Sequence, residues 1–253
     1  MPTLKDIDGV IFDLGNTLIP FTPRDSMEFV MKWYSSSKMG SFDIPFSLFL
    51  ETYREVVREE RSRAARERWE TSVDERSRRV AEKLSNNKTG IEVPFGSLKE
   101  HHSASFAATL HINSSARRVL DILSRSTNEK GTPLKLGLIS NAGDPEAVRD
   151  FLDRESLTQY FCSIVISGDV GFAKPRAEIF LRALDMMKIK AERSVYVGDR
   201  YETDFMGSAR VKMKPVYIRQ FKTAGEPPEG VEIEPTIKHI LDLIPLLMDQ
   251  QGR

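Results

Sequence analysis

Acidic side chains stand directly after two apolar runs of this 253-residue sequence. Asp13 follows the run at 9–12, and Asp199 follows the run at 194–197 after one glycine, with a second carboxylate, Asp204, five residues later. Such runs predict buried strands, and open α/β sheets bind ligands at the carboxyl ends of their strands. Asp13 is therefore placed to act as a nucleophile.

Polar and basic residues after two further runs extend this pattern. The run at 134–139 is followed by Ser140 and Asn141, whose hydroxyl and amide can donate hydrogen bonds to an anionic oxygen. A later loop carries Lys174, a fixed positive charge, and Pro175, which we expect to open the next helix. We expect the four strand ends to converge on one site.

The apolar runs alternate with helical patterns in the second half of the chain, as in βαβ units with a parallel sheet. Each run is nearly continuously apolar, which is typical of strands covered by helices on both faces. The sequence therefore predicts an α/β fold with a Rossmann-like, doubly wound parallel sheet. Its strands are expected at residues 9–12, 134–139, 163–166, 194–197 and 215–218, with a weaker sixth at 231–233.

The segment between the first two runs differs, because it has helical periodicity and no convincing strand. We predict a helical cap domain at residues 23–113, inserted into a core domain formed by residues 1–22 and 114–253. Its clearest helices are expected at 47–69, 74–84 and 97–110. The arginines near residue 60 alternate with glutamates at helix-pair spacings, which indicates a solvated helix face rather than a nucleic-acid patch.

The composition is that of a soluble enzyme, with 40% hydrophobic and 29% charged residues and 37 Lys+Arg against 37 Asp+Glu. The N-terminal apolar run is interrupted by Asp6 and Asp8 and is too short for a signal peptide or a membrane span. We expect a cytoplasmic monomer or homodimer without nucleic-acid or membrane partners. Cys162, the only cysteine, excludes an internal disulfide and is expected to be a buried structural thiol.

Taken in order, the four strand ends resemble the motifs of the haloacid dehalogenase-like superfamily. These motifs are a strand with a nucleophilic Asp, a strand ending in Ser or Thr, a Lys often followed by Pro, and an acidic Gly-Asp…Asp pair. The resemblance covers roughly residues 5–22 and 114–245, and the intervening helices resemble the family's helical cap. It implies a phosphatase that takes a small phosphorylated metabolite as substrate.

The resemblance also implies a role for each residue. Asp13 would attack phosphorus and form an aspartyl-phosphate, which water then hydrolyses. Ser140 and Asn141 would bind the phosphoryl oxygens, and Lys174 would neutralise those oxygens and the nucleophile. Clustered carboxylates repel one another unless a hard cation lies among them, which suits Mg²⁺. Its ligands would be Asp13, Asp199, Asp204 and the backbone carbonyl of Gly15.

Gly15 departs from the pattern of the family's phosphatases, which usually have a second Asp there as general acid and base. Such catalysis contributes typically ~10²–10⁴-fold. Two alternatives follow from this departure. The chain could be another hydrolase of the family, such as a 2-haloacid dehalogenase, or a non-catalytic descendant that binds or scaffolds. Dehalogenases attack carbon without a metal, however, and would make less use of the pair Asp199 and Asp204.

Overall fold

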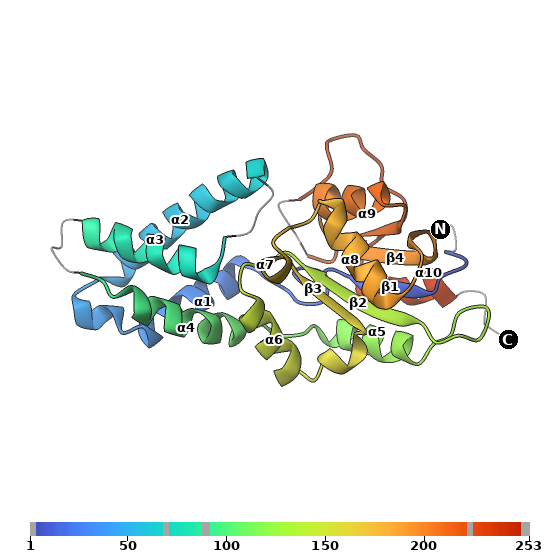
Figure 1. Ribbon diagram of the computed structural model, residues 1–253, viewed down its shortest axis with the longest axis horizontal. Coiled ribbons are helices and arrows are strands. Elements are labelled where there is room, and N and C mark those ends of the chain that lie inside the picture. Colours follow the sequence, from blue (N-terminus) through green and yellow to red (C-terminus); the bar gives the residue numbers. More distant parts are fainter. Residues whose placement is uncertain (1–3, 68–70, 88–91, 222–224, 249–253) are drawn as a thin grey trace. The chain divides into compact units, whose positions relative to one another are not determined.

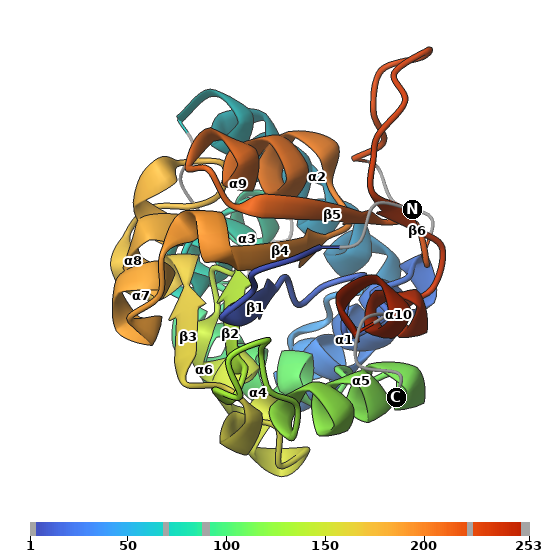
Figure 2. The same ribbon diagram turned by 90° about the vertical axis from the view of Figure 1, so that its right-hand side faces the viewer.

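The computed structural model describes residues 4–67, 71–87, 92–221 and 225–248. A parallel six-stranded sheet has the order β3-β2-β1-β4-β5-β6, and β1, the first strand along the chain, lies near its centre (Figures 1 and 2). Its strands are β1 (Gly9–Phe12), β2 (Lys135–Ser140), β3 (Ser163–Ile166), β4 (Ser194–Gly198), β5 (Lys214–Ile218) and β6 (Thr236–Ile237). This confirms the predicted α/β fold class, and the first five strands lie within one residue of their predicted bounds.

The sixth strand was predicted in the wrong place. Residues 231–233 form no strand, and β6 lies instead at 236–237, where it pairs with the end of β5. Val231 is 41% exposed, so its apolar side chain does not mark a buried strand. A two-residue edge strand is defined by backbone pairing alone, and it leaves no side-chain period that a sequence could reveal.

Helices cover both faces of the sheet. In Figure 2, α8 and α9 lie on one face and α5 and α10 on the other, as expected of a doubly wound sheet. The α-helices that belong with the sheet, including the short α7, are α5 (Ser114–Ser124), α7 (Ser167–Val170), α8 (Ala177–Met187), α9 (Met206–Arg210) and α10 (Leu243–Met248). Pro175 does not open α8 as predicted, because that helix begins two residues later with Arg176 as its N-cap.

The remaining helices form a unit of their own. They are α1 (Pro23–Ser36), α2 (Phe46–Glu67), α3 (Val73–Asn86), α4 (Phe95–Ala107) and α6 (Pro145–Arg154). Thr22 caps α1 in a capping box with Asp25, and Pro23 takes the first helical position, where its missing N–H costs nothing. The helices predicted at 74–84 and 97–110 correspond to α3 and α4. The one predicted at 47–69 corresponds to α2, and its last residues, 68 and 69, lie outside the described residues.

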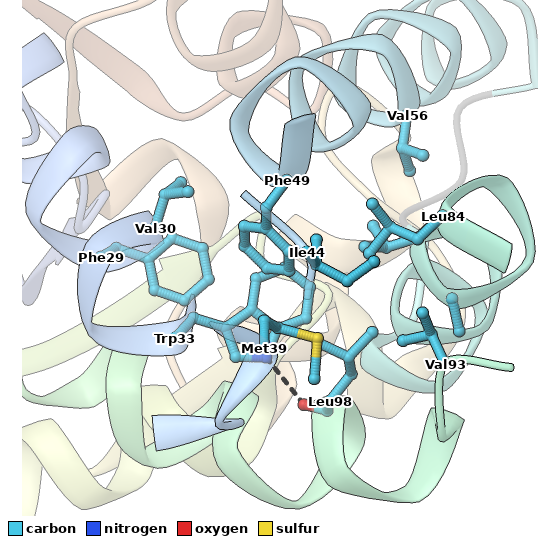
Figure 3. Close-up of a cluster of buried hydrophobic side chains, with 12 residues drawn as sticks. Phe29, Val30, Trp33, Met39, Ile44, Phe49, Val56, Leu84, Val93 and Leu98 are labelled. Atoms are coloured by element: carbon cyan, nitrogen blue, oxygen red, sulfur yellow. Dashed lines mark hydrogen bonds between the residues drawn. The ribbon is translucent and has the colours of Figure 1, made fainter. Parts of the chain in front are cut away.

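A buried aromatic and aliphatic cluster holds this helical unit together (Figure 3). Trp33 is at its centre, where it stacks on Phe29 and meets Phe49 edge to face. Its indole N–H donates to the carbonyl oxygen of Leu98 at 2.7 Å, so the one polar atom of the ring is satisfied inside the core. Burial of this apolar surface, rather than helix propensity, stabilises the helices.

Ion pairs link the charged faces of α2 and α3. Glu55 pairs with Lys83 at 2.7 Å, Glu60 pairs with Arg76 at 2.9 Å, and Glu59 pairs with Arg79. The charges of α2 were predicted to form a solvated helix face. Glu55 and Glu59 are exposed, as this predicts, whereas Glu60 is buried beside Arg76.

The chain passes several times between its two compact units. One consists of residues 1–20, 111–141 and 155–253, and the other of residues 21–110 and 142–154. Helix α6 therefore belongs with the inserted helices, although the sequence places it among the elements of the sheet domain. None of the helices in the described ranges is long and apolar enough to cross a membrane.

Cys162 is exposed, contrary to the prediction of a buried thiol. It lies just before β3, which is an edge strand, so its side chain faces solvent while Ser163 is buried. Its Sγ donates to the carbonyl oxygen of Leu136 at 3.3 Å, and partial burial raises its pKa. The thiol is therefore accessible but not activated.

Candidate active site

Asp13 stands at the carboxyl end of the central strand. Its backbone N–H donates to the carbonyl oxygen of Val197 at 2.9 Å and so continues the ladder from β1 to β4 by one residue. Its carboxylate is buried and accepts hydrogen bonds from Thr17 Oγ1 at 3.3 Å and from Lys174 Nζ at 2.5 Å. Both carboxylate oxygens are thereby oriented.

Lys174 bridges the carboxylates of Asp13 and Asp204. Its Nζ lies 2.5 Å from Asp13 Oδ1 and 2.7 Å from Asp204 Oδ1, and its side chain is 3% exposed. A third bond, at 2.9 Å, runs from Nζ to the hydroxyl oxygen of Tyr196. A longer contact, at 3.4 Å, reaches the carbonyl oxygen of Ile139, so each of the three ammonium protons has an acceptor.

Asp204 lies within a π-helical turn, η4 (Tyr201–Phe205), that follows β4. It is not the N-cap of a helix. Its Oδ2 instead accepts from the backbone N–H of the N-cap residue Arg200 at 3.0 Å, while its Oδ1 faces Lys174 and Tyr196. A Cβ at Gly198 would lie 2.5 Å from the Cβ of Asp204, so only glycine allows this carboxylate to fold back against the strand.

Tyr196 is a member of the site that the sequence analysis missed. Its hydroxyl accepts from Lys174 and donates to Asp204 Oδ1 at 3.2 Å, with the ring fully buried in β4. One signal was available in the sequence. A tyrosine in an otherwise apolar buried strand must find a partner for its hydroxyl, and the ends of the neighbouring strands are where polar groups gather.

Ser140 and Asn141 lie where β2 ends. Ser140 is the buried last residue of the strand. The side-chain amide of Asn141 brackets the backbone of Lys174: Nδ2 donates to the lysine carbonyl oxygen at 3.0 Å, and Oδ1 accepts from the lysine N–H at 2.8 Å. Asn141 therefore holds the lysine loop in place.

Asp13, Asp199 and Asp204 each offer a carboxylate oxygen, and these three atoms lie within 4.8 Å of one another. Burial raises the pKa of Asp199 to about 8, with the charges of Asp13 and Asp204 adding to the effect. Burial also raises the pKa of Asp13, partly offset by Lys174. For Lys174, burial works in the opposite sense, but attraction to Asp13 and Asp204 outweighs it and raises the pKa. The site is short of positive charge.

The residues present fit a divalent cation. Asp199 Oδ2 is buried and has no hydrogen-bond partner among the described residues, a costly state for a carboxylate oxygen unless a ligand takes it up. Hard oxygen donors of this kind suit Mg²⁺. Asp204 is more fully engaged, because both of its oxygens already have partners in the protein.

Comparison with known proteins agrees with this geometry. The family model for haloacid dehalogenase-like hydrolases matches residues 7–211. A glyceraldehyde 3-phosphate phosphatase from Methanothermobacter thermautotrophicus is 30% identical over 126 residues, which are 50% of this chain and 52% of that protein. A phosphoserine phosphatase from Thermus thermophilus is 30% identical over 105 residues, which are 42% of this chain and 40% of that protein. The chain thus spans about half the length, or less, of these curated relatives.

Solved structures share the fold along nearly the whole chain. A 2-haloacid dehalogenase from Pseudomonas syringae has a TM-score of 0.65 at 20% identity, covering 95% of this chain and 97% of that one. The putative HAD-hydrolase YfnB from Bacillus subtilis has a TM-score of 0.67 at 17% identity, covering 96% of this chain and 100% of that one. At these identities the likeness concerns the fold alone.

Replacing Tyr196 with Phe tests whether its hydroxyl is part of the buried charge network. Loss of the hydroxyl leaves Lys174 and Asp204 each one partner short, so we expect the free energy of unfolding to fall by about 1–3 kcal/mol. Urea unfolding measures this change. Tyr160→Phe is the matched control, because that hydroxyl bonds to the half-buried Asp121 outside the site and its loss should cost below about 1 kcal/mol. Equal losses in the two variants would contradict the assignment of Tyr196 to the network.

Proposed function

Because the chain belongs to the haloacid dehalogenase-like hydrolase family, we propose that it is a magnesium-dependent phosphatase acting on a small phosphorylated metabolite. The observation that carries this proposal is the buried set of Asp13, Asp199 and Asp204 with Lys174 among them. The names of the curated relatives, which are phosphatases, favour it over a dehalogenase.

Asp13 is the proposed nucleophile. A carboxylate oxygen of Asp13 forms a bond to phosphorus while the bond from phosphorus to the leaving oxygen breaks, which gives an aspartyl-phosphate and an alcohol. Water then attacks the phosphorus of this intermediate, releases inorganic phosphate and restores the carboxylate. Thr17 and Lys174 support the step by fixing the two oxygens of Asp13.

Positive charge and hydrogen-bond donors stabilise the transferring phosphoryl group in this account. Lys174 offsets the charge on its oxygens, and Ser140 donates to one of them from the end of β2. Asn141 contributes to phosphate binding in two ways: its side chain holds the lysine backbone through two hydrogen bonds, and its own backbone lies at the end of the strand. Asp204 and Tyr196 keep the ammonium of Lys174 directed toward Asp13.

Magnesium would be held by Asp13, Asp199 and the backbone carbonyl of Gly15, with Asp204 as the third carboxylate of the set. When bound, the cation supplies the charge that a dianionic phosphate needs in order to approach a carboxylate. The buried Asp199 Oδ2, which has no hydrogen-bond partner in the described part of the chain, supports this assignment.

Removal of the metal tests the proposal. Excess chelator should abolish hydrolysis of p-nitrophenyl phosphate, and added Mg²⁺ should restore it. Asp199→Asn should raise the Mg²⁺ concentration for half-maximal activity by at least about tenfold, because a ligand charge is lost. Asp185→Asn is the control, since that side chain is 70% exposed on α8. Full activity in chelator would overturn the magnesium assignment.

Gly15 provides a second test, because it stands where the acid and base of the family's phosphatases usually lies. Its backbone is outside the left-handed region, and a Cβ built there meets no atom within 4 Å, so an aspartate fits. We expect Gly15→Asp to raise turnover of alkyl phosphates relative to aryl phosphates by about 10²-fold, since poor leaving groups gain most from a proton donor.

The control for this experiment is Gly15→Asn, which has the same size but cannot transfer a proton in the same way. It should leave the ratio of alkyl to aryl turnover at the wild-type value. If Gly15→Asp also leaves that ratio unchanged, another group already supplies the proton, and Gly15 is not the reason for any limit on activity.

A further inference from the structure

The segment that follows the proposed phosphate-binding residues is built into the helical unit. Asn141 is the last residue of its stretch in the sheet unit, and residues 142–154 pack with residues 21–110. The chain therefore enters the helical unit immediately after Ser140 and Asn141. Hydrogen bonds and close contacts fix this segment within the helical unit.

A buried histidine–aspartate pair ties the start of the segment to α4. His102 Nδ1 lies 2.8 Å from Asp144 Oδ2, and both side chains are at most 3% exposed. Ser103 Oγ donates to Asp144 Oδ1 at 3.0 Å, and the same oxygen caps α6 by accepting from the N–H of Ala147. Asp144 thus connects α4 and α6 through one carboxylate.

Burial favours the neutral form of the His102 imidazole. Burial lowers its pKa, against the opposing effect of Asp144, and its Nε2 is buried with no hydrogen-bond partner among the described residues. A proton on Nε2 would be a donor without an acceptor, so the proton sits on Nδ1 and points at the carboxylate. The rings of Phe29 and Trp33 meet the imidazole edge to face, with centroids 5.1 and 4.9 Å away.

Two further contacts fasten the segment. Arg154, at its end, donates to the carbonyl oxygens of Ala107 at 2.7 Å and Leu110 at 2.6 Å. Near its start, a Cβ at Gly143 would lie 1.9 Å from the carbonyl oxygen of Thr71, so the backbone approach there requires glycine. The segment is therefore held to the helices at both ends.

In the sheet unit, the side chain of Asn141 forms two hydrogen bonds with the backbone of Lys174. Only Ala142 and Gly143 separate this bracket from Asp144. Two residues give the chain little slack, since successive Cα atoms are a fixed 3.8 Å apart. The anchor at Asp144 therefore restrains Asn141 and, through it, the backbone of Lys174.

We propose that Asp144 is a positioning residue for Lys174. The buried His102–Asp144 pair fixes the start of the segment 142–154, and this fixed point sets the two hydrogen bonds of Asn141 to the lysine backbone. The inference rests on the proposed function only in that Lys174 is taken to face the phosphoryl group. The coupling itself is a property of the protein without substrate.

Hydrogen exchange of the Lys174 backbone amide tests the coupling, because that N–H donates to Asn141 Oδ1. In the full-length protein without substrate, His102→Phe removes the donor to Asp144 and keeps an aromatic ring in the apolar pocket. We expect exchange at Lys174 to become faster by about tenfold, as for the loss of one buried hydrogen bond. The amide of Ile11 in β1 should keep its wild-type rate.

Leu84→Ala is the matched control. Leu84 lies in the apolar cluster around Trp33, which includes no residue of the segment 142–154 among the described residues, and its truncation destabilises that cluster. Faster exchange at Lys174 in His102→Phe but not in Leu84→Ala supports the proposal. Wild-type exchange in His102→Phe, or equal acceleration in both variants, overturns it, because the effect would then be absent or would reflect stability alone.

A second variant covers the case in which His102→Phe does not fold. Gly143→Ala forces the backbone away from Thr71 and should give the same acceleration at Lys174, while unchanged exchange would overturn the proposal. In assays with p-nitrophenyl phosphate, either folded variant should lower kcat by about tenfold with KM unchanged, since Lys174 acts on the transferring group. The exchange readout needs no activity, so failure of the coupling and failure of the phosphatase assignment remain distinguishable.

Discussion

Three carboxylates brought together in a buried place around a single ammonium are the constraint on which the site depends. Burial disfavours charge on Asp13 and Asp199, and one lysine does not balance the set. The parallel sheet creates this situation, because it gathers the carboxyl ends of β1, β2 and β4 at one edge. The protein satisfies Asp204 completely, through Lys174, Tyr196 and the N–H of Arg200. One oxygen of Asp199 has no hydrogen-bond partner within the described ranges. Shortage of positive charge is thus what makes the site suited to a cation, whose charge a phosphate would need in order to approach.

Much of the fold was predictable from the sequence, since five strands are continuous apolar runs covered on both faces. The site residues Asp13, Lys174, Asp199 and Asp204 could be found for the same reason, because each follows such a run or the loop after it. Features that depend on pairing across the fold were not predictable. The strand β6 exists only through its bonds to β5, and the exposure of Cys162 follows from the edge position of β3. For Tyr196 the sequence indicates only that a buried hydroxyl needs a partner, and the identity of its partners, Lys174 and Asp204, follows from the fold.

Domain membership illustrates the same limit. Residues 142–154 read as the helix of a βαβ unit, yet they pack with the inserted helices through Asp144 and Arg154. Neither His102 nor Asp144 belongs to a motif, and they lie 42 residues apart in the sequence. Their pairing is evident only in three dimensions, where a buried neutral imidazole needs an acceptor for its one proton. The consequence is that the helical unit includes a segment that directly follows Ser140 and Asn141 in the chain.

The central claim is that Asp13 forms a bond to phosphorus, and trapping the intermediate tests it most directly. The protein would be mixed with a ³²P-labelled acyl or aryl phosphate and Mg²⁺, quenched in acid during turnover, digested and mapped by mass spectrometry. The account predicts a phosphoryl group on the peptide that contains Asp13, at the Asp13 carboxylate, and none in Asp13→Asn. A phosphoryl group on any other residue would contradict it, as would turnover that persists in Asp13→Asn.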